Sequence, residues 1–198
     1  FPAMINDWRK KWGKDFPFYW VQLANYMDAV EVPSESLWAQ VREAQTQTLS
    51  LSHTGQAVII DIGEAKDIHP KNKQEVGRRL ALHALHNDYG FSDVVCESPM
   101  PKTVRRVQDK IVVQFDNVAD GLIVKNKYGY LMSFAVAGND GVYKWVQAKV
   151  AGKDRVVLSC PDVIDPVSVR YAWGDNPDDA NLYNSVGLPA TPFEIKIE

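Results

Sequence analysis

Apolar residues follow two different patterns in the first 91 residues of the chain. Over residues 4–12, 37–44 and 76–85 they recur every three or four positions, which places them on one face of a helix. Between these segments lie two apolar runs without alternation, FPFYWVQLA at 16–24 and AVIIDI at 57–62. Such runs are typical of strands that are covered on both faces of a sheet. The order helix, strand, helix, strand, helix predicts an α/β fold.

Residues that start or stop helices mark the ends of these segments. Gly13 follows the first periodic segment and is expected to end its helix. Ser34 or Ser36 is expected to cap the second helix, because a serine side chain can accept a hydrogen bond from the first turn. Pro70 is suited to the first turn of the third helix, and Gly90 closes that unit.

The pattern changes near residue 92. From there on, the apolar segments are short, rich in β-formers and separated by turn signals such as Asn139-Asp140-Gly141. This pattern predicts an antiparallel β-sandwich over residues 92–198, following an α/β part over residues 1–91.

Two strands do not make a stable parallel sheet, since both faces and both edges of such a sheet must be covered. By themselves, residues 1–91 would leave the apolar faces of both runs in water. We therefore expect this part to be the carboxyl-terminal portion of a larger α/β domain, with the remaining strands either on a separate chain or lost. Phe1 is not an initiator methionine, which favours a cleaved or excised product.

Composition and charge limit the classes of function that the chain can have. The 198 residues are 45% hydrophobic and 24% charged, as in an ordinary globular protein. The net charge of −3 gives no sign of the basic surface that binds nucleic acid. No apolar run approaches the ~20 residues of a membrane span, so no membrane partner is expected. Cys96 and Cys160 could pair or stay free.

The segment that follows the second apolar run carries the candidate chemistry. A short loop presents Asp67 and His69 directly before Pro70. Open α/β sheets place their reactive groups on loops at the carboxyl ends of strands. The alternative is a histidine that only precedes a helix. His83 and His86 lie three residues apart, but no third ligand has the spacing of a metal site.

Several blocks, in the same order, resemble the sialate O-acetylesterase family of the SGNH hydrolases. They are FPAMINDWRKKWG with FPFYWVQLANY, SLWAQVREAQ, VIIDIG with DIHPKNKQEVGRRLA, and VSVRYAWGDNPDDANLYNSVGLPATPF. The resemblance implies the carboxyl-terminal part of a flavodoxin-like three-layer α/β/α hydrolase domain, followed by a β-sandwich. It also implies a serine esterase that removes O-acetyl groups from sialic acids, needs no cofactor, and is secreted, periplasmic or lysosomal.

The resemblance also implies roles for single residues. His69 matches the general base. In the wider superfamily an aspartate commonly lies three residues before that histidine, but here the position holds Lys66. Asp67 is therefore the first choice for orienting the imidazole, with Asp61 and Glu64 in reserve. The alternatives are a histidine that acts without a close carboxylate, and an Asp67 that only caps the helix ahead of Pro70 or faces solvent in the loop.

The family's nucleophilic serine and oxyanion-hole donors have no match in this chain. The implied partner is an amino-terminal portion of the same enzyme that carries the serine, and the implied substrate is an O-acetylated sugar.

Gln22 and Arg42 lie inside family-like blocks and are candidates for substrate binding. For Gln22 a structural hydrogen bond is the alternative, since a buried amide needs partners. Trp145 and Trp173 could stack on sugar rings or pack inside the sandwich. Four more tryptophans are expected in the core: Trp8, Trp12, Trp20 and Trp38.

Two other functions remain open at this point. The chain could be a non-catalytic carbohydrate-binding or scaffold fragment whose β-rich part is the working part. It could also belong to an acetylesterase that acts on plant polysaccharides.

Overall fold

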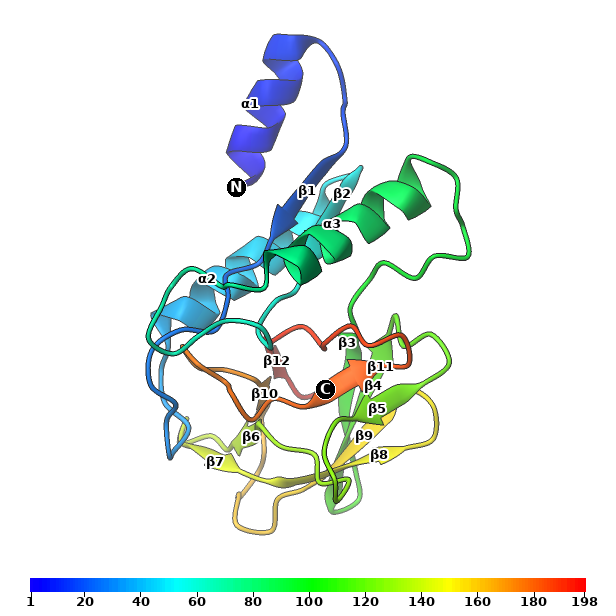
Figure 1. The fold of residues 1–198 in the computed structure, drawn as a ribbon. Coiled ribbons are helices and arrows are strands. Elements are labelled where there is room, and N and C mark those ends of the chain that lie inside the picture. Colours follow the sequence, from blue (N-terminus) through cyan, green and yellow to red (C-terminus); the bar gives the residue numbers. More distant parts are fainter.

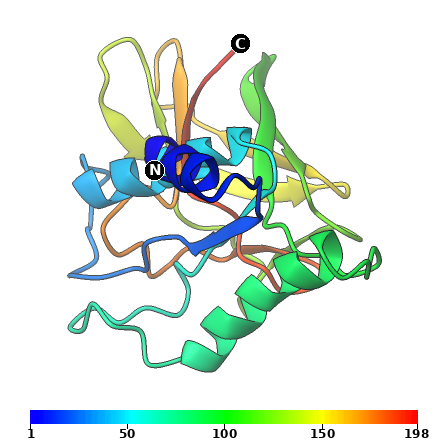
Figure 2. The ribbon, with the colours of Figure 1, turned by 90° about the horizontal axis from the view of Figure 1, so that it is seen from above.

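The computed structural model describes residues 1–198 (Figure 1). Its first part contains three helices and a two-stranded parallel sheet, in the predicted order. Strands β1 and β2 pair in parallel, with Phe18 opposite Thr54 and Val21 opposite Ala57. In Figure 2, α2 and α3 lie on opposite sides of β1. The bounds are α1 Pro2–Trp12, β1 Phe18–Val21, α2 Leu37–Gln47, the 3-10 turn η1 Thr48–Ser50, β2 Thr54–Ala57 and α3 Lys73–Asn87.

Two of the predicted helix boundaries are confirmed and one is wrong. Gly13 ends α1 in the left-handed conformation, with φ of 62°. The Ser36 hydroxyl caps α2 by accepting a hydrogen bond from the Ala39 N–H at 2.9 Å. The third helix does not start at Pro70. It starts at Lys73, because the Asn72 side chain accepts from the Glu75 N–H at 3.1 Å and acts as the N-cap.

The strand predicted at residues 57–62 is shifted. The ladder ends at Ala57, where the expected strand begins. The following residues Val58, Ile59 and Ile60 are nevertheless buried, with at most 3% of each exposed. Val58 and Ile60 lie in the hydrophobic cluster of the β-rich part. An unbroken apolar run therefore reflects burial here, and it does not require a continuous strand.

The β-rich part contains antiparallel sheets, as predicted. One four-stranded sheet has the order β12-β10-β6-β7, another has β3-β4-β9-β8, and β11 pairs with β5. The bounds are β3 Met100–Val107, β4 Lys110–Asp116, β5 Leu122–Val124, β6 Phe134–Ala137, β7 Tyr143–Trp145, β8 Gln147–Ala151, β9 Arg155–Ser159, β10 Ser168–Tyr171, β11 Leu182–Asn184 and β12 Phe193–Lys196.

The two parts share one hydrophobic core. Its cluster of 20 buried residues joins side chains of both four-stranded sheets, such as Val113 and Phe134, to Val58 and Ile60 from the α/β part. The apolar run after β2 is therefore covered within this chain. That differs from the expectation that it needs strands from elsewhere.

Helix α1 departs from the predicted core. Trp8 is 47% exposed and Trp12 is 76% exposed, although both were expected to be buried. The helix stands at the top of the molecule, apart from the β-rich part (Figure 1). Trp20, by contrast, is buried, and its indole donates to Gln56. Cys96 and Cys160 are both free and buried. None of the helices is long and apolar enough to cross a bilayer.

Candidate active site

The loop between β2 and α3 carries His69. Hydrogen bonds with Asn25 and Met27 hold the first half of this loop in place. The Asn25 side-chain oxygen accepts a hydrogen bond from the Gly63 N–H at 2.6 Å. The Asn25 amide in turn donates to the Asn176 side-chain oxygen at 2.8 Å. Asn176 donates to the Met27 carbonyl at 2.8 Å, and the Met27 N–H donates to the Ala65 carbonyl at 3.0 Å. The loop is thus held at Gly63 and Ala65.

A glycine is required at position 63 because the backbone approaches Asn25 closely. A Cβ atom there would lie 2.2 Å from the Asn25 carbonyl oxygen and 2.3 Å from its side-chain oxygen. Such contacts are far inside van der Waals distance, so one of the two segments would have to move.

We expect Gly63→Ala to lower the free energy of unfolding by about 1–3 kcal/mol, the usual cost of overpacking. Urea denaturation measures this change. Gly77→Ala is the control, since Gly77 lies inside α3 and a Cβ there would meet nothing within 4 Å. That change should be neutral or stabilise by up to about 1 kcal/mol, because alanine is the better helix former. Equal effects of the two variants would contradict the close-approach argument.

Asp67 and His69 lie together at the tip of the loop. The Asp67 Oδ1 atom accepts a hydrogen bond from the His69 backbone N–H at 2.9 Å and lies 3.4 Å from the His69 Nδ1 atom. In this local turn the aspartate side chain accepts from the backbone N–H of the second residue after it. The turn therefore holds the Asp67 carboxylate beside the His69 ring. The N–H bond, with the imidazole beside it, holds the pKa of Asp67 below its usual value. The His69 side chain is 83% exposed.

The two reserve carboxylates have other partners. Asp61 forms an ion pair with Arg79, at 2.6 Å from Nη1, and also accepts from the Tyr183 hydroxyl at 3.2 Å. Glu64 pairs with Lys71 at 2.7 Å. Of the three carboxylates considered for His69, only Asp67 contacts its ring. The catalytic roles of both residues stay predictions.

Gln22 and Arg42 are both buried, at 1% and 0% exposed. The Gln22 amide donates to the Thr46 hydroxyl at 2.9 Å, while its side-chain oxygen has no partner. Neither side chain is accessible to a sugar from solvent in this structure. Their contacts are structural, because burial leaves no open surface around them.

Arg42 joins two distant segments of the chain. Its guanidinium donates to the carbonyls of Leu23, Ala24, Gly174 and Asp175 at 2.6–2.9 Å. Burial lowers the pKa of Arg42 to about 10, so the group remains charged at neutral pH. The residue therefore holds the segment after β1 against the segment that contains Asn176.

Histidines 83 and 86 have structural partners as well. His83 is buried, and its Nε2 atom lies 3.0 Å from the Gln56 carbonyl. Burial lowers the pKa of His83, which favours the neutral ring. His86 Nδ1 lies 2.8 Å from the Val94 carbonyl. No group of three or more His, Cys, Asp or Glu side chains is arranged to hold a metal.

Sequence reasoning missed Asn25 and Asn176, which hold the loop. They lie 151 positions apart, so no local spacing connects them. The available signal was that each lies inside a block that resembles the family, LANY for Asn25 and GDNPDD for Asn176.

Comparisons with known proteins cover almost the whole chain. No family model matches it. The sialate O-acetylesterase of Mus musculus is 28% identical over 227 residues, covering all of this chain and 40% of the relative. That of Homo sapiens is 28% identical and covers 98% of this chain and 41% of the relative.

A solved structure is more similar. The crystal structure of a carbohydrate acetylesterase from Xanthomonas citri has a TM-score of 0.90 and 44% identity, covering 98% of this chain and 44% of that one. The chain thus spans about two fifths of the length of the proteins it matches. The predicted resemblance is confirmed: over its whole length the chain is similar to the carboxyl-terminal part of the sialate O-acetylesterases.

Proposed function

We propose that this chain is part of a carbohydrate O-acetylesterase, in which His69 transfers protons and Asp67 orients it. The observation that carries the proposal is the pair of side chains 3.4 Å apart on a loop that follows β2 of the parallel sheet. Loops at this end of parallel strands are the usual place for reactive groups. The similarity to acetylesterases along the whole chain supports the same function.

The geometry supports a different role for each of the two ring nitrogens. Nδ1 is the atom that lies near Asp67, so Nε2 is left for the reacting hydroxyl. A serine Oγ would form a bond to the acetyl carbonyl carbon while Nε2 takes its proton. The bond from that carbon to the sugar oxygen then breaks, and Nε2 returns the proton to the sugar. In the second half, a water oxygen forms a bond to the acetyl carbonyl carbon while Nε2 takes its proton. The bond from that carbon to the serine Oγ then breaks, Nε2 returns the proton to Oγ, and acetate leaves.

The serine and the oxyanion hole would come from an amino-terminal portion of the same enzyme. Strands β1 and β2 pair only with each other, so each has one edge free to receive a further strand. Additional strands would extend this sheet to the three-layer α/β/α arrangement, with α2 and α3 already on opposite sides (Figure 2). The exposed Trp8 and Trp12 of α1 offer an apolar surface for that portion.

The substrate class is tested on the protein at its natural length. Acetate release is measured from an O-acetylated sialic acid and from an acetylated plant polysaccharide. A fluorophosphonate probe reports on an activated serine. We expect release from at least one substrate and labelling of one serine outside these 198 residues. Absence of both would refute the proposal, and release from the polysaccharide alone would favour the plant-directed esterase.

Asp67→Asn is expected to lower kcat by about 10⁴-fold at unchanged fold, as is known for a triad aspartate, because an amide permits the wrong imidazole tautomer. Activity on a fluorogenic acetate measures this effect. Glu64→Gln is the matched control, since Glu64 lies on the same loop but pairs with Lys71. Asp61→Asn should act mainly on stability through its ion pair with Arg79. A larger loss of activity in either of these would show that the orienting carboxylate had been misassigned.

A further inference from the structure

The β-rich part carries a groove on the outer face of its β4-β9-β8 sheet. The larger section of this groove has a volume of about 730 Å³ and a mostly apolar lining. A smaller pocket of about 290 Å³ adjoins it, since both are lined by Leu131, Met132, Trp145 and Val146. We call the two together the Trp145 groove. Its size falls within the range of small-molecule sites.

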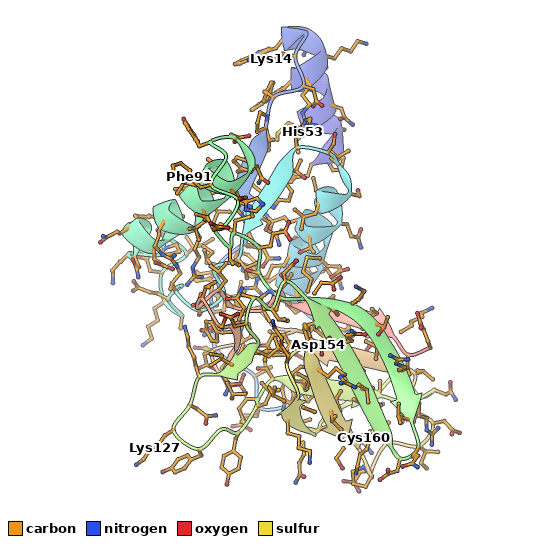
Figure 3. The ribbon with its side chains drawn as sticks, turned by 90° about the vertical axis from the view of Figure 1, so that its right-hand side faces the viewer. Lys14, His53, Phe91, Lys127, Asp154 and Cys160 are labelled. Carbon is orange, nitrogen blue, oxygen red and sulfur yellow. The ribbon has the colours of Figure 1, made fainter.

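Aromatic side chains stand exposed along the groove. Trp145, at the end of β7, is 42% exposed and lies where the two sections meet. Its indole donates to the Glu31 carbonyl at 2.9 Å, which fixes the orientation of the ring. Tyr130 is 68% exposed and packs beside Tyr128, with 6.1 Å between ring centres. Both tyrosines lie within three residues of Lys127, whose loop projects from the molecule in Figure 3. Exposed aromatics gathered on one surface mark binding sites.

The polar groups of the groove favour an uncharged ligand. In the larger section, Ser159 accepts from Lys110, whose charge is already offset by Asp109 at 3.0 Å. Lys149 also lines this section and brings a positive charge to it. Asp178 and Asp179 line the smaller section and would repel an anion. The groove therefore carries charges of both signs, and the hydroxyl groups of a neutral ligand can donate to these carboxylates and accept from the Lys149 ammonium.

We propose that the Trp145 groove binds a chain of neutral sugar units, with a sugar ring stacked on Trp145 and another near Tyr130. A sugar ring has flat C–H faces that can stack on the aromatic rings of the groove. The hydroxyl groups at its edge can bond the polar side chains. The site lies outside the Asp67–His69 pair and binds without reacting.

The smaller section also lies beside residues that hold the loop of His69. Asn176 lines it, and so do residues 29–31, which closely follow Met27. Met27 donates to Ala65 of the loop, and Asn176 bonds both Met27 and Asn25. A sugar chain in the groove would therefore extend toward the loop that carries His69, which suits an enzyme that acts on polymers.

The test measures binding by titration calorimetry with the natural-length protein carrying His69→Ala. The probes are cellohexaose, xylohexaose and mannohexaose, with a sialic acid hexamer as the anionic comparison. We expect at least one neutral probe to bind, and Trp145→Ala to weaken it roughly tenfold, the effect of losing an aromatic stack. Tyr130→Ala should weaken it as well. Tyr89→Ala is the matched control, because Tyr89 is 72% exposed but lies after α3, outside the groove.

Binding of none of the neutral probes, preference for the anionic one, or equal weakening by Tyr89→Ala would overturn the proposal. Its failure is distinguishable from failure of the esterase function. In the protein with His69 intact, Trp145→Ala and Tyr130→Ala should leave hydrolysis of a small soluble acetate within twofold of wild type. Sugar binding without esterase activity would refute the proposed function but would still support the sugar-binding groove.

Discussion

Replacement of His69 by alanine is expected to lower the rate of acetate release by roughly three to six orders of magnitude, as for other members of a catalytic triad. Without the imidazole, no group on the loop can take the serine proton near neutral pH and return it to the leaving sugar oxygen. The measurement is kcat/KM on a fluorogenic acetate, in the protein at its natural length. The exposed ring should be dispensable for folding, so the thermal unfolding midpoint should stay close to wild type.

A second histidine provides a matched control. His53 is also exposed, and its Nδ1 atom lies 3.0 Å from a carboxylate oxygen of Asp15. Its local chemistry thus resembles that of His69, but it lies before β2, at the other end of the strand. His53→Ala should keep nearly full activity. A rate within tenfold of wild type for His69→Ala would remove that residue from the mechanism.

The elements that the sequence predicted well are those determined locally. The Gly13 stop and the Ser36 cap depend on residues within one turn of a helix, and both are confirmed. The turn at Asn139-Asp140-Gly141 also joins two antiparallel strands, β6 and β7, with φ of 71° at the glycine. Such signals need no knowledge of the rest of the chain.

The elements that were misplaced depend on distant neighbours. The run Val58–Ile60 is apolar because the β-rich part covers it, and not because a strand continues there. Apolar periodicity placed Trp8 and Trp12 in a core, but within this chain that face of α1 is only partly covered. Ile5 is buried, whereas Trp8 and Trp12 remain 47% and 76% exposed. A pattern of burial predicts that a residue is covered, and it does not say which segment covers it.

The candidate site divides in the same way. Asp67, His69 and the loop that carries them could be found from the sequence, because they are adjacent and resemble a known block. The Asn25–Asn176 contact and the role of Arg42 could not, because each connects segments more than 130 positions apart. Arg42 looked like a substrate ligand for the same reason that Gln22 did: a polar residue inside a family-like block gives no sign of whether it faces solvent.

Arg42→Ala is expected to have the largest effect on stability. It removes donors from the carbonyls of Leu23, Ala24, Gly174 and Asp175 at a position that is 0% exposed. The Ala24 carbonyl keeps the Trp38 indole as a donor, and the Asp175 carbonyl keeps the Tyr26 N–H. The Leu23 and Gly174 carbonyls lose their donor, and each buried carbonyl left without a partner costs about 1–3 kcal/mol. We expect a loss of about 3–5 kcal/mol, a large share of the ~5–15 kcal/mol of a typical domain.

Urea denaturation of Arg42→Ala measures this loss, and two variants show its origin. Arg42→Lys keeps the positive charge. Its single ammonium cannot reach the carbonyls that the planar guanidinium bonds on both segments, so this variant should recover only part of the stability. Arg155→Ala removes an arginine whose side chain is 57% exposed and 3.6 Å from Asp154, and should cost less than about 1 kcal/mol. Hydrogen exchange should quicken at the Tyr26 N–H, which donates to the Asp175 carbonyl across the same junction. A cost for Arg42→Ala as small as that for Arg155→Ala would mean that the shared core holds the two segments together without the guanidinium.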